Sequence, residues 1–441
     1  MKPKPASALL PLWCHTASPL PKHRCIRADE LVDPGWRADT IVIGAGVTGL
    51  STALHLAERG ARVAVLERNQ PGEGTTGSAN GQVIAGLQQG PDALVAAYGH
   101  ERGERLVEFA GNAPALLFDL VARYGIACDV ERAGWVQAAR SSRGVKSLEK
   151  LAESWSRRGA PVRMLDRVSV MRLLGTAAYA GGWLDERNGT IQPLSYARGL
   201  AAAAARAGVE IRTGVDVGDV ERDRDGQWRI ATNLGEVRAP TVVVATNVYT
   251  SRLTGLAKTF LGRTYVSAYS VQLASEPLDE ALRQCVLPQR HSCGDTGHLR
   301  LRYFRLDRDG RFVIGGPGWL TPPRSASATS FRVLEAGARR MFPQLARTRF
   351  EYRWAAHDTV TPDLLPHLYE PAPGLFSALG FTGRGLAIGT ALGSVLARRV
   401  LGESPASLPY PTTPASSLPL NLPAAAKYYL RAGLAKLRRE K

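Results

Sequence analysis

The chain has 441 residues, of which 44% are hydrophobic and 22% are charged, and this length predicts two interleaved domains with a sizeable core. The composition excludes collagen-like, coiled-coil and wholly disordered proteins. The formal net charge of +17 is concentrated at the two ends, because residues 1–28 and residues 424–441 each carry +5. We therefore expect no nucleic-acid partner for the body of the protein.

Cysteine usage and hydropathy favour a cytoplasmic protein. The five cysteines are odd in number and form no Cys-x-x-Cys pair, which indicates reduced thiols. The longest uncharged apolar stretch, residues 385–397, has 13 residues, whereas a membrane-spanning helix needs about 18. Pro11 interrupts the apolar stretch near the N-terminus, so export is not favoured. We expect no transmembrane segment.

A basic, proline-rich leader over residues 1–36 precedes the first periodic segment. Residues 39–44 form a short β-branched run closed by glycine, and residues 47–59 carry apolar side chains at helical spacing. Residues 62–67 form a second apolar run. This succession predicts a βαβ unit with buried parallel strands.

Later segments alternate between helical and strand periodicity. Apolar residues at three- and four-residue intervals predict helices at residues 101–109, 113–124, 146–158 and 330–341. A period of two predicts strands between 209 and 245, at 265–273 and at 311–314. Six prolines between Pro405 and Pro423 predict a linker, after which residues 424–441 form a short basic helix.

The strongest motif is Gly44-Ala-Gly46-Val-Thr-Gly49, which stands between the first strand and the first helix. The glycines permit a tight turn and bring backbone N–H groups close to a pyrophosphate at the helix N-terminus. Glu67 ends the next strand 18 residues after Gly49 and suits ribose hydroxyls. An acid at this position disfavours the 2′-phosphate of NADP. The motif predicts a dinucleotide site that accepts either FAD or NAD.

Two further segments are rich in small residues. The loop over residues 71–90 offers amides and hydroxyls for phosphates or a flavin, although a surface loop would have a similar composition. The glycine turn at residues 379–390 leads from a strand into a helix. There the helix dipole and Arg384 would raise the electron affinity of a flavin; the alternative is a turn that serves helix packing alone.

Taken in order, these segments resemble the FAD-dependent D-amino acid oxidase superfamily. The resemblance rests on residues 41–67, 74–82, 183–193, 215–217, 244–247 and 380–387. The gamma-glutamylputrescine oxidoreductase group is the most similar, since it shares Tyr-Phe-Arg-Leu before Asp309-Gly-Arg311 and a basic, Tyr-rich tail. The Ser78-Ala-Asn-Gly segment differs from that group and is nearer to D-amino acid dehydrogenases.

The resemblance implies an α/β protein of the α+β two-domain type. A Rossmann-like FAD-binding domain is interleaved with a substrate domain built on an antiparallel sheet. The expected boundaries place residues 37–100, 186–262 and 352–402 in the FAD-binding domain, and residues 101–185 and 263–351 in the substrate domain. Residues 403–423 would form the proline-rich linker and residues 424–441 the basic C-terminal helix.

The resemblance also implies FAD and assigns residues to it; we expect the FAD to be non-covalent, because no cysteine lies in the segments expected near the ring and His357 is only a weak candidate for attachment. The ADP half would contact Gly44, Gly46, Gly49, Glu67, Arg68 and Val217, with Ala245 and Thr246 over the pyrophosphate. The pyrophosphate and isoalloxazine ring would run along Thr75, Thr76, Ser78, Asn80, Gly81 and Gln82. The flavin O2 side would meet Gly380, Thr382, Gly383, Arg384 and Gly385. We expect no metal.

For function, the resemblance implies oxidation of the C–N bond of an amine, either gamma-glutamylputrescine-like or secondary. A hydride would pass to flavin N5 and the imine would hydrolyse, with oxygen or another molecule as electron acceptor. Aromatic residues that could enclose an alkylamine are Tyr265, Tyr269, Tyr303, Trp354 and His357, although each alone is more often a core residue than a ligand contact.

A charge at one position favours an amine over an amino acid. Relatives that oxidise small amino acids often carry an arginine where Asp307 stands, and an acid there would repel a carboxylate. Arg302 or Arg305 could supply the missing positive charge. The alternatives are a D-amino acid dehydrogenase or oxidase, a flavin enzyme that modifies tRNA, and a non-catalytic FAD-binding protein.

Overall fold

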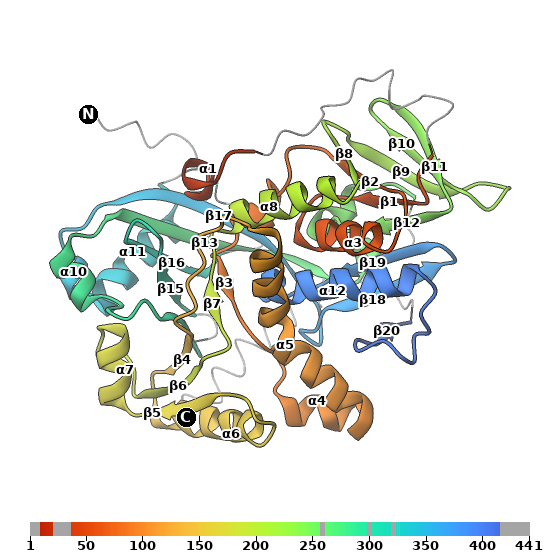
Figure 1. The fold of residues 1–441 in the computed structure, drawn as a ribbon. Helices are drawn as coiled ribbons and strands as arrows, with labels where there is room; N and C mark the ends of the chain where they lie inside the picture. Colours follow the sequence, from red (N-terminus) through yellow and green to blue (C-terminus); the bar gives the residue numbers. More distant parts are fainter. Residues whose placement is uncertain are drawn as a thin grey trace, which may run out of the picture.

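The structure, a computed structural model, describes residues 9–20, 37–255, 261–297, 301–318, 323, 325 and 327–414. Two large sheets dominate it (Figure 1). None of the helices in these ranges combines the length and apolar character of a membrane-spanning segment. The predicted basic helix at 424–441 lies outside the described residues, as do residues 1–8 and 21–36 of the predicted leader.

The first sheet has seven strands in the order β20-β18-β19-β12-β1-β2-β8. Its strands are β1 (Thr40–Ile43), β2 (Val63–Glu67), β8 (Glu210–Thr213), β12 (Thr241–Val244), β18 (His367–Ala372), β19 (Leu375–Leu379) and β20 (Thr412–Thr413). From β19 to β8 all neighbours are parallel, whereas β18 pairs antiparallel with β19. The predicted βαβ unit is therefore confirmed as β1, α3 (Val47–Ala57) and β2.

Both faces of this sheet are buried, which explains the continuous apolar runs of its strands. Val42 packs in the cluster formed with the helices, whereas Ile41 and Ile43 pack with Trp228 on the other face. The helices are α3, α5 (His100–Tyr124), α8 (Pro193–Arg206) and α12 (Gly385–Val400). The opposite layer is a small antiparallel sheet of β9 (Val217–Arg222), β10 (Trp228–Thr232) and β11 (Gly235–Ala239).

The second sheet, called here the substrate sheet, has eight strands in the order β17-β13-β16-β15-β14-β4-β6-β5. Only β14 and β4 pair in parallel. Its strands are β4 (Trp135–Ala139), β5 (Val162–Leu165), β6 (Gly181–Asp185), β13 (Val266–Pro277), β14 (Ser292–Asp295), β15 (Tyr303–Leu306), β16 (Arg311–Pro317) and β17 (Phe350–Val360). One face packs against α7 (Arg167–Leu174) and α11 (Thr329–Met341).

Shorter elements connect the two sheets and cover their edges. They are α1 (Trp13–Thr16), η1 (Thr76–Ser78), β3 (Gln82–Val83), α4 (Pro91–Tyr98), α6 (Ser142–Ser156), β7 (Gly189–Thr190), η2 (Asn247–Arg252), η3 (Leu261–Arg263), α10 (Glu280–Cys285) and η5 (Pro343–Leu345).

Several boundaries differ from the predicted ones. The helices expected at 101–109 and 113–124 are one helix, α5, which runs through Gly111, where an added Cβ would come within 3.1 Å of the Trp155 ring. Strand β17 pairs with β13 in the substrate sheet, although residues from 352 on were assigned to the FAD-binding domain. The first part of the predicted linker is packed, since Tyr410 is buried and its hydroxyl donates to Pro366 O. Residues 9–20 of the predicted leader are packed too.

Candidate functional site

The first glycine turn joins β1 to α3. Gly44 has φ +103°, and a Cβ on Gly49 would lie 2.0 Å from the carbonyl oxygen of Gly44, so the turn itself requires both glycines. Gly46 caps α3 without a side-chain hydrogen bond, and the first turn of the helix carries no acid. The N-terminus of α3 is therefore a positive helix end that suits an anion.

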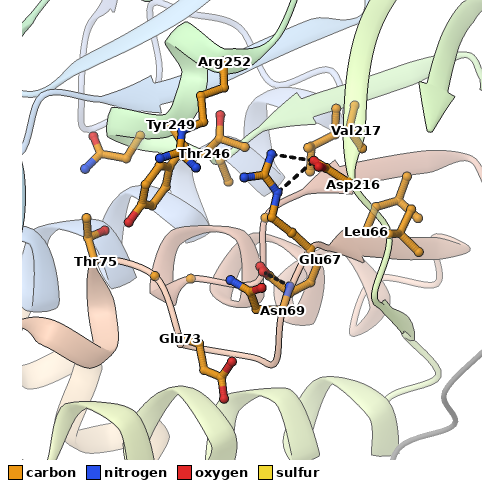
Figure 2. A pocket seen from close by; sticks show the side chains of 18 of the residues that line it. Leu66, Glu67, Asn69, Glu73, Thr75, Asp216, Val217, Thr246, Tyr249 and Arg252 are labelled. Atoms are coloured by element: carbon orange, nitrogen blue, oxygen red, sulfur yellow. Dashed lines mark hydrogen bonds and ion pairs between the residues drawn. The ribbon is translucent and has the colours of Figure 1, made fainter. Parts of the chain in front are cut away.

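Glu67 stands at the end of β2 beside this turn. Its carboxylate accepts the backbone N–H groups of Ala45 at 2.7 Å and Asn69 at 2.8 Å. Burial raises the pKa of Glu67, and these two hydrogen bonds oppose that rise. Arg68 pairs with Asp216 at 2.6 Å (Figure 2). Glu67 keeps lone pairs that can accept ribose hydroxyls.

A pocket with about 950 Å³ of space, its mouth included, lies against these groups (Figure 2). Most residues predicted for the ADP half line it, namely Gly44, Gly46, Glu67, Arg68, Thr75, Thr76, Val217, Ala245 and Thr246. Sequence reasoning missed further lining residues, among them Glu73, Asp216, Asn247, Tyr249 and Arg252. Asp216 and Asn247 lie within segments 215–217 and 244–247, which carry the resemblance, but no role was assigned to them, and Glu73, Tyr249 and Arg252 lie outside those segments.

The loop 78–82 leaves this pocket and runs beneath the substrate sheet. The carbonyl of Ser78 accepts hydrogen bonds from Trp354 Nε1 at 3.0 Å and Gln272 Nε2 at 2.8 Å. The carbonyl of Ala79 accepts one from Trp13 Nε1 at 2.7 Å. Side chains from outside the seven-stranded sheet therefore fix the orientation of the loop.

The second half of the loop is held in the same way. Arg305 Nη1 donates to Gly81 O at 3.2 Å, and Trp135 Nε1 donates to Gln82 Oε1 at 3.1 Å. Asn80 Nδ2 donates to Gln272, but the buried Asn80 Oδ1 has no hydrogen-bond partner among the described residues. A buried acceptor without a donor is costly, so this atom indicates a ligand N–H at the loop.

The late glycine turn joins β19 to α12. Gly380, Thr382 and Gly383 all have positive φ, and α12 begins after Arg384 with no side-chain cap and no acid in its first turn. Arg384 Nη1 donates to Ala85 O at 2.9 Å. Burial lowers the pKa of Arg384 to about 10, which leaves the guanidinium charged at neutral pH. This turn also presents a positive helix end.

The two glycine turns lie at the same edge of the seven-stranded sheet. Strands β1 and β19 both run parallel to β12, so the turns that follow them emerge on one side. Helices α3 and α12 also pack closely, because a Cβ on Gly393 would lie 2.5 Å from Ser51 Cβ. The late turn does not line the pocket beside Glu67. The site is therefore extended, with separate places for the two halves of a dinucleotide.

The register of the substrate sheet separates the five predicted aromatic residues. Trp354 pairs with Gln272, Gln272 with Gly315, and Gly315 with Tyr303, so these side chains share the face that contacts loop 78–82. Tyr269 pairs with His357, and both lie on the opposite face. Tyr265 is buried in the core, and its hydroxyl donates to Val248 O at 2.8 Å. The structure therefore does not bring the five together.

His357 belongs to an aromatic cluster next to η2. Its ring stacks on Tyr269 at 4.1 Å between centroids and meets Tyr249 edge-on at 5.8 Å. Burial, and the charge of Arg252, lower the pKa of His357 to about 4. The imidazole is consequently neutral at physiological pH.

The charge argument from Asp307 was wrong about the position of this residue. The Asp307 carboxylate accepts the N–H of Arg311 at 2.7 Å and closes the turn between β15 and β16. Arg311 pairs with Pro277 at one end of β13. Pro277 is nine residues from Ala268, so about 30 Å of strand separates these two residues. Ala268 marks the end of the sheet near the late turn, so Asp307 lies far from it.

The two arginines proposed as substitutes are both engaged elsewhere. Arg305 Nη1 donates to Gly81 O and to Ile191 O at 2.8 Å. Arg302 donates to Leu301 O and lies beside Gly337 of α11, behind the sheet.

A carboxyl group that the sequence did not reveal stands next to the late turn. Asp358 pairs with Ala268 on β13 and lies on the same face of the substrate sheet as Trp354. It accepts the backbone N–H groups of Thr359 and Gly383. Burial raises the pKa of Asp358 to about 6, against these two hydrogen bonds.

These features fit FAD. The glycine cradle and Glu67 suit the ADP half, while the unpartnered Asn80 Oδ1 and the positive end of α12 suit a ring that has N–H donors and gains negative charge on reduction. The contacts of individual residues with FAD stay predictions.

Comparisons with known proteins identify the family. A family model described as "FAD dependent oxidoreductase" matches residues 39–399 of this chain. The chain is 30% identical over 368 residues to "Probable oxidoreductase OrdL" of Haemophilus influenzae, covering 83% of each chain. It is 28% identical to gamma-glutamylputrescine oxidoreductase of Escherichia coli, covering 89% of this chain and 92% of the relative. The glycine oxidase structure from Geobacillus kaustophilus superposes with a TM-score of 0.71 at 22% identity, covering 86% of this chain and 100% of that one. This chain belongs to the FAD dependent oxidoreductase family and is an FAD-dependent oxidoreductase.

Proposed function

We propose that the protein oxidises the C–N bond of an amine whose reacting carbon bears no carboxylate. The observation that carries this proposal is Asp358, a carboxyl group on the face of the substrate sheet that contacts loop 78–82, next to the late glycine turn. A carboxylate there accepts hydrogen bonds from an amine N–H and repels a substrate carboxylate. The two relatives named above include an enzyme for gamma-glutamylputrescine, which supports the same substrate class.

The residues around Asp358 supply orientation and exclusion of water. Tyr303 is half-buried on the same face, and burial raises the pKa of its hydroxyl to about 12, so the hydroxyl stays neutral. Trp354, four residues before Asp358 on β17, is fully buried and holds the backbone of loop 78–82 through Ser78 O. An alkylamine beside Asp358 and Tyr303 loses part of its hydration, which favours its neutral, oxidisable form, while the Asp358 carboxylate opposes this effect.

FAD, when bound, supplies the chemistry by accepting a hydride from the carbon next to nitrogen. The chain holds the substrate so that this carbon is presented to the flavin. Asp358 would accept the amine N–H, while Arg384 with the N-terminus of α12 would favour negative charge at the flavin.

An amino-acid substrate is the second candidate, and Arg384 favours it. The guanidinium donates Nη1 to Ala85 O and lies 5.4 Å from the centroid of the Trp135 ring. Its remaining N–H groups could bind a substrate carboxylate. The tRNA-modifying alternative has no specific observation in its favour among the described residues.

A substrate panel separates the two candidates. Holoenzyme is mixed without oxygen with mono- and diamines, gamma-glutamylated amines, secondary amines and D- and L-amino acids, and flavin bleaching is followed at 450 nm as an approximate marker of reduction. Peroxide production in air then distinguishes oxidase from dehydrogenase. We expect amines to bleach the flavin fastest, and we expect Asp358→Asn to raise KM for amines by about tenfold. The proposal would be contradicted if amino acids bleached the flavin faster than amines and if Asp358→Asn left the KM for amines unchanged.

A further inference from the structure

Residues 9–20, called here the N-terminal segment, pack across the junction between the two large sheets. Helix α1 lies against α8 and η1, above β13 and β17 (Figure 1). Leu12 and Trp13 are 0% and 1% exposed and share a cluster with Leu194 of α8 and Trp354 of β17. A segment that precedes the dinucleotide motif is thus part of the folded body.

Polar contacts fix this segment to α8. Ser18 N donates to Ser195 Oγ at 2.9 Å, and Arg198 Nη1 donates to Ser18 O at 2.7 Å. Gln192 Nε2 donates to Trp13 O at 3.1 Å. The backbone of the segment is therefore anchored on the FAD-binding side without help from loop 78–82.

Trp13 connects this anchored segment to the loop. Its Nε1 donates to Ala79 O, its ring meets Trp354 edge-on at 6.2 Å, and Arg305 lies over the ring at 5.0 Å. The peptide between Ala79 and Asn80 is planar and trans, so its N–H points opposite to its C=O. A carbonyl held toward Trp13 directs the N–H of Asn80, the residue whose buried Oδ1 has no partner among the described residues, away from the N-terminal segment.

We propose that the N-terminal segment positions loop 78–82 for the flavin half of FAD, with Trp13 as the positioning residue. Retention of FAD then depends on residues that lie before the glycine motif. The inference depends on FAD binding and is independent of which C–N donor the enzyme oxidises.

The test compares two tryptophans that each donate Nε1 to a backbone carbonyl. Trp13→Phe keeps an aromatic side chain but replaces the indole with a smaller phenyl ring and so removes the donor to Ala79 O. Trp228→Phe makes the same exchange in the β9–β11 layer, where the Trp228 Nε1 donates to Pro373 O at 3.2 Å. Deflavinated protein is titrated with FAD by flavin fluorescence and with ADP by calorimetry. We expect Trp13→Phe to raise the Kd for FAD about threefold to tenfold, the equivalent of one hydrogen bond.

ADP distinguishes positioning from general destabilisation, because residues 78–82 do not line the pocket beside Glu67. Trp13→Phe should leave the Kd for ADP unchanged, and Trp228→Phe should change neither constant. Deletion of residues 1–20 should yield colourless protein that still binds ADP. An unchanged Kd for FAD in Trp13→Phe, or an equal loss of ADP affinity, would overturn the inference, and this variant decides the matter even if the deletion fails to fold.

Discussion

Gly46 and Gly49 belong to one motif, yet alanine at Gly46 should mainly weaken cofactor binding, whereas alanine at Gly49 should mainly destabilise the fold. A Cβ on Gly46 would meet the Thr76 hydroxyl at 3.3 Å, and the φ of Gly46 is −79°, which alanine adopts freely. A Cβ on Gly49 would lie 2.0 Å from Gly44 O and 3.1 Å from Ala245 Cβ. Gly46→Ala is thus tolerated by the protein alone, whereas Gly49→Ala forces the turn apart.

The magnitudes follow from these contacts. Gly46→Ala exchanges a favourable N-cap residue for a poor one, which lowers the free energy of unfolding by about 1 kcal/mol. Gly49→Ala overpacks a buried turn and should lower it by about 3 kcal/mol. If the FAD pyrophosphate binds at the N-terminus of α3 as predicted, a methyl group on Gly46 would displace it. The loss of one charge-assisted hydrogen bond, about 1.5–3 kcal/mol, raises Kd roughly tenfold to hundredfold.

The assay measures both quantities on deflavinated protein. Thermal unfolding followed by circular dichroism reports stability, and FAD titration followed by fluorescence quenching reports affinity. We expect Gly46→Ala to separate the two, with near-normal unfolding and weak FAD binding, while Gly49→Ala lowers the unfolding temperature most. If Gly46→Ala bound FAD within about twofold of the wild type, the pyrophosphate could not lie against this turn, and the assignment of the pocket would fail.

Two other substitutions test the late turn. The pKa of Asp358 is raised from 3.8 to about 6, so the folded state binds the proton more tightly, and the stability that this contributes is lost as pH rises from about 4 through about 6. Asp358→Asn should therefore raise the unfolding temperature more at pH 8 than at pH 5. Equal effects at both pH values would refute the shift. Arg384→Gln removes a buried charge from the start of α12 and should lower the reduction potential of bound FAD by about 30–60 mV in an equilibrium dye titration. An unchanged potential would place Arg384 away from the ring.

Much of the ADP-binding half could be predicted from the sequence. The order of strand, glycine turn, helix and second strand depends on residues within 29 positions of one another, and so does the place of Glu67. Spacing of this kind needs no knowledge of distant contacts. The same locality limits it, because local spacing did not show that the predicted helices on either side of Gly111 form the single helix α5.

The substrate side depended on strand pairing. Tyr303 and Trp354 share a face and Tyr269 does not, since the register between β13, β15, β16 and β17 alternates side chains across the sheet. Asp307 and Asp358 are both acids near aromatic residues in the sequence, but the pairing sends one to a distant turn and the other to the late glycine turn.

The sequence by itself determined the dinucleotide turn, the acid that follows it and the family, because each is written in contiguous residues. Tertiary structure alone decided that Trp13 of the N-terminal segment meets Ala79 and that Asp358 stands beside Gly383. Such meetings join residues 66 and 25 positions apart. Their physical cause is the order and register of strands, which no local pattern of side chains specifies.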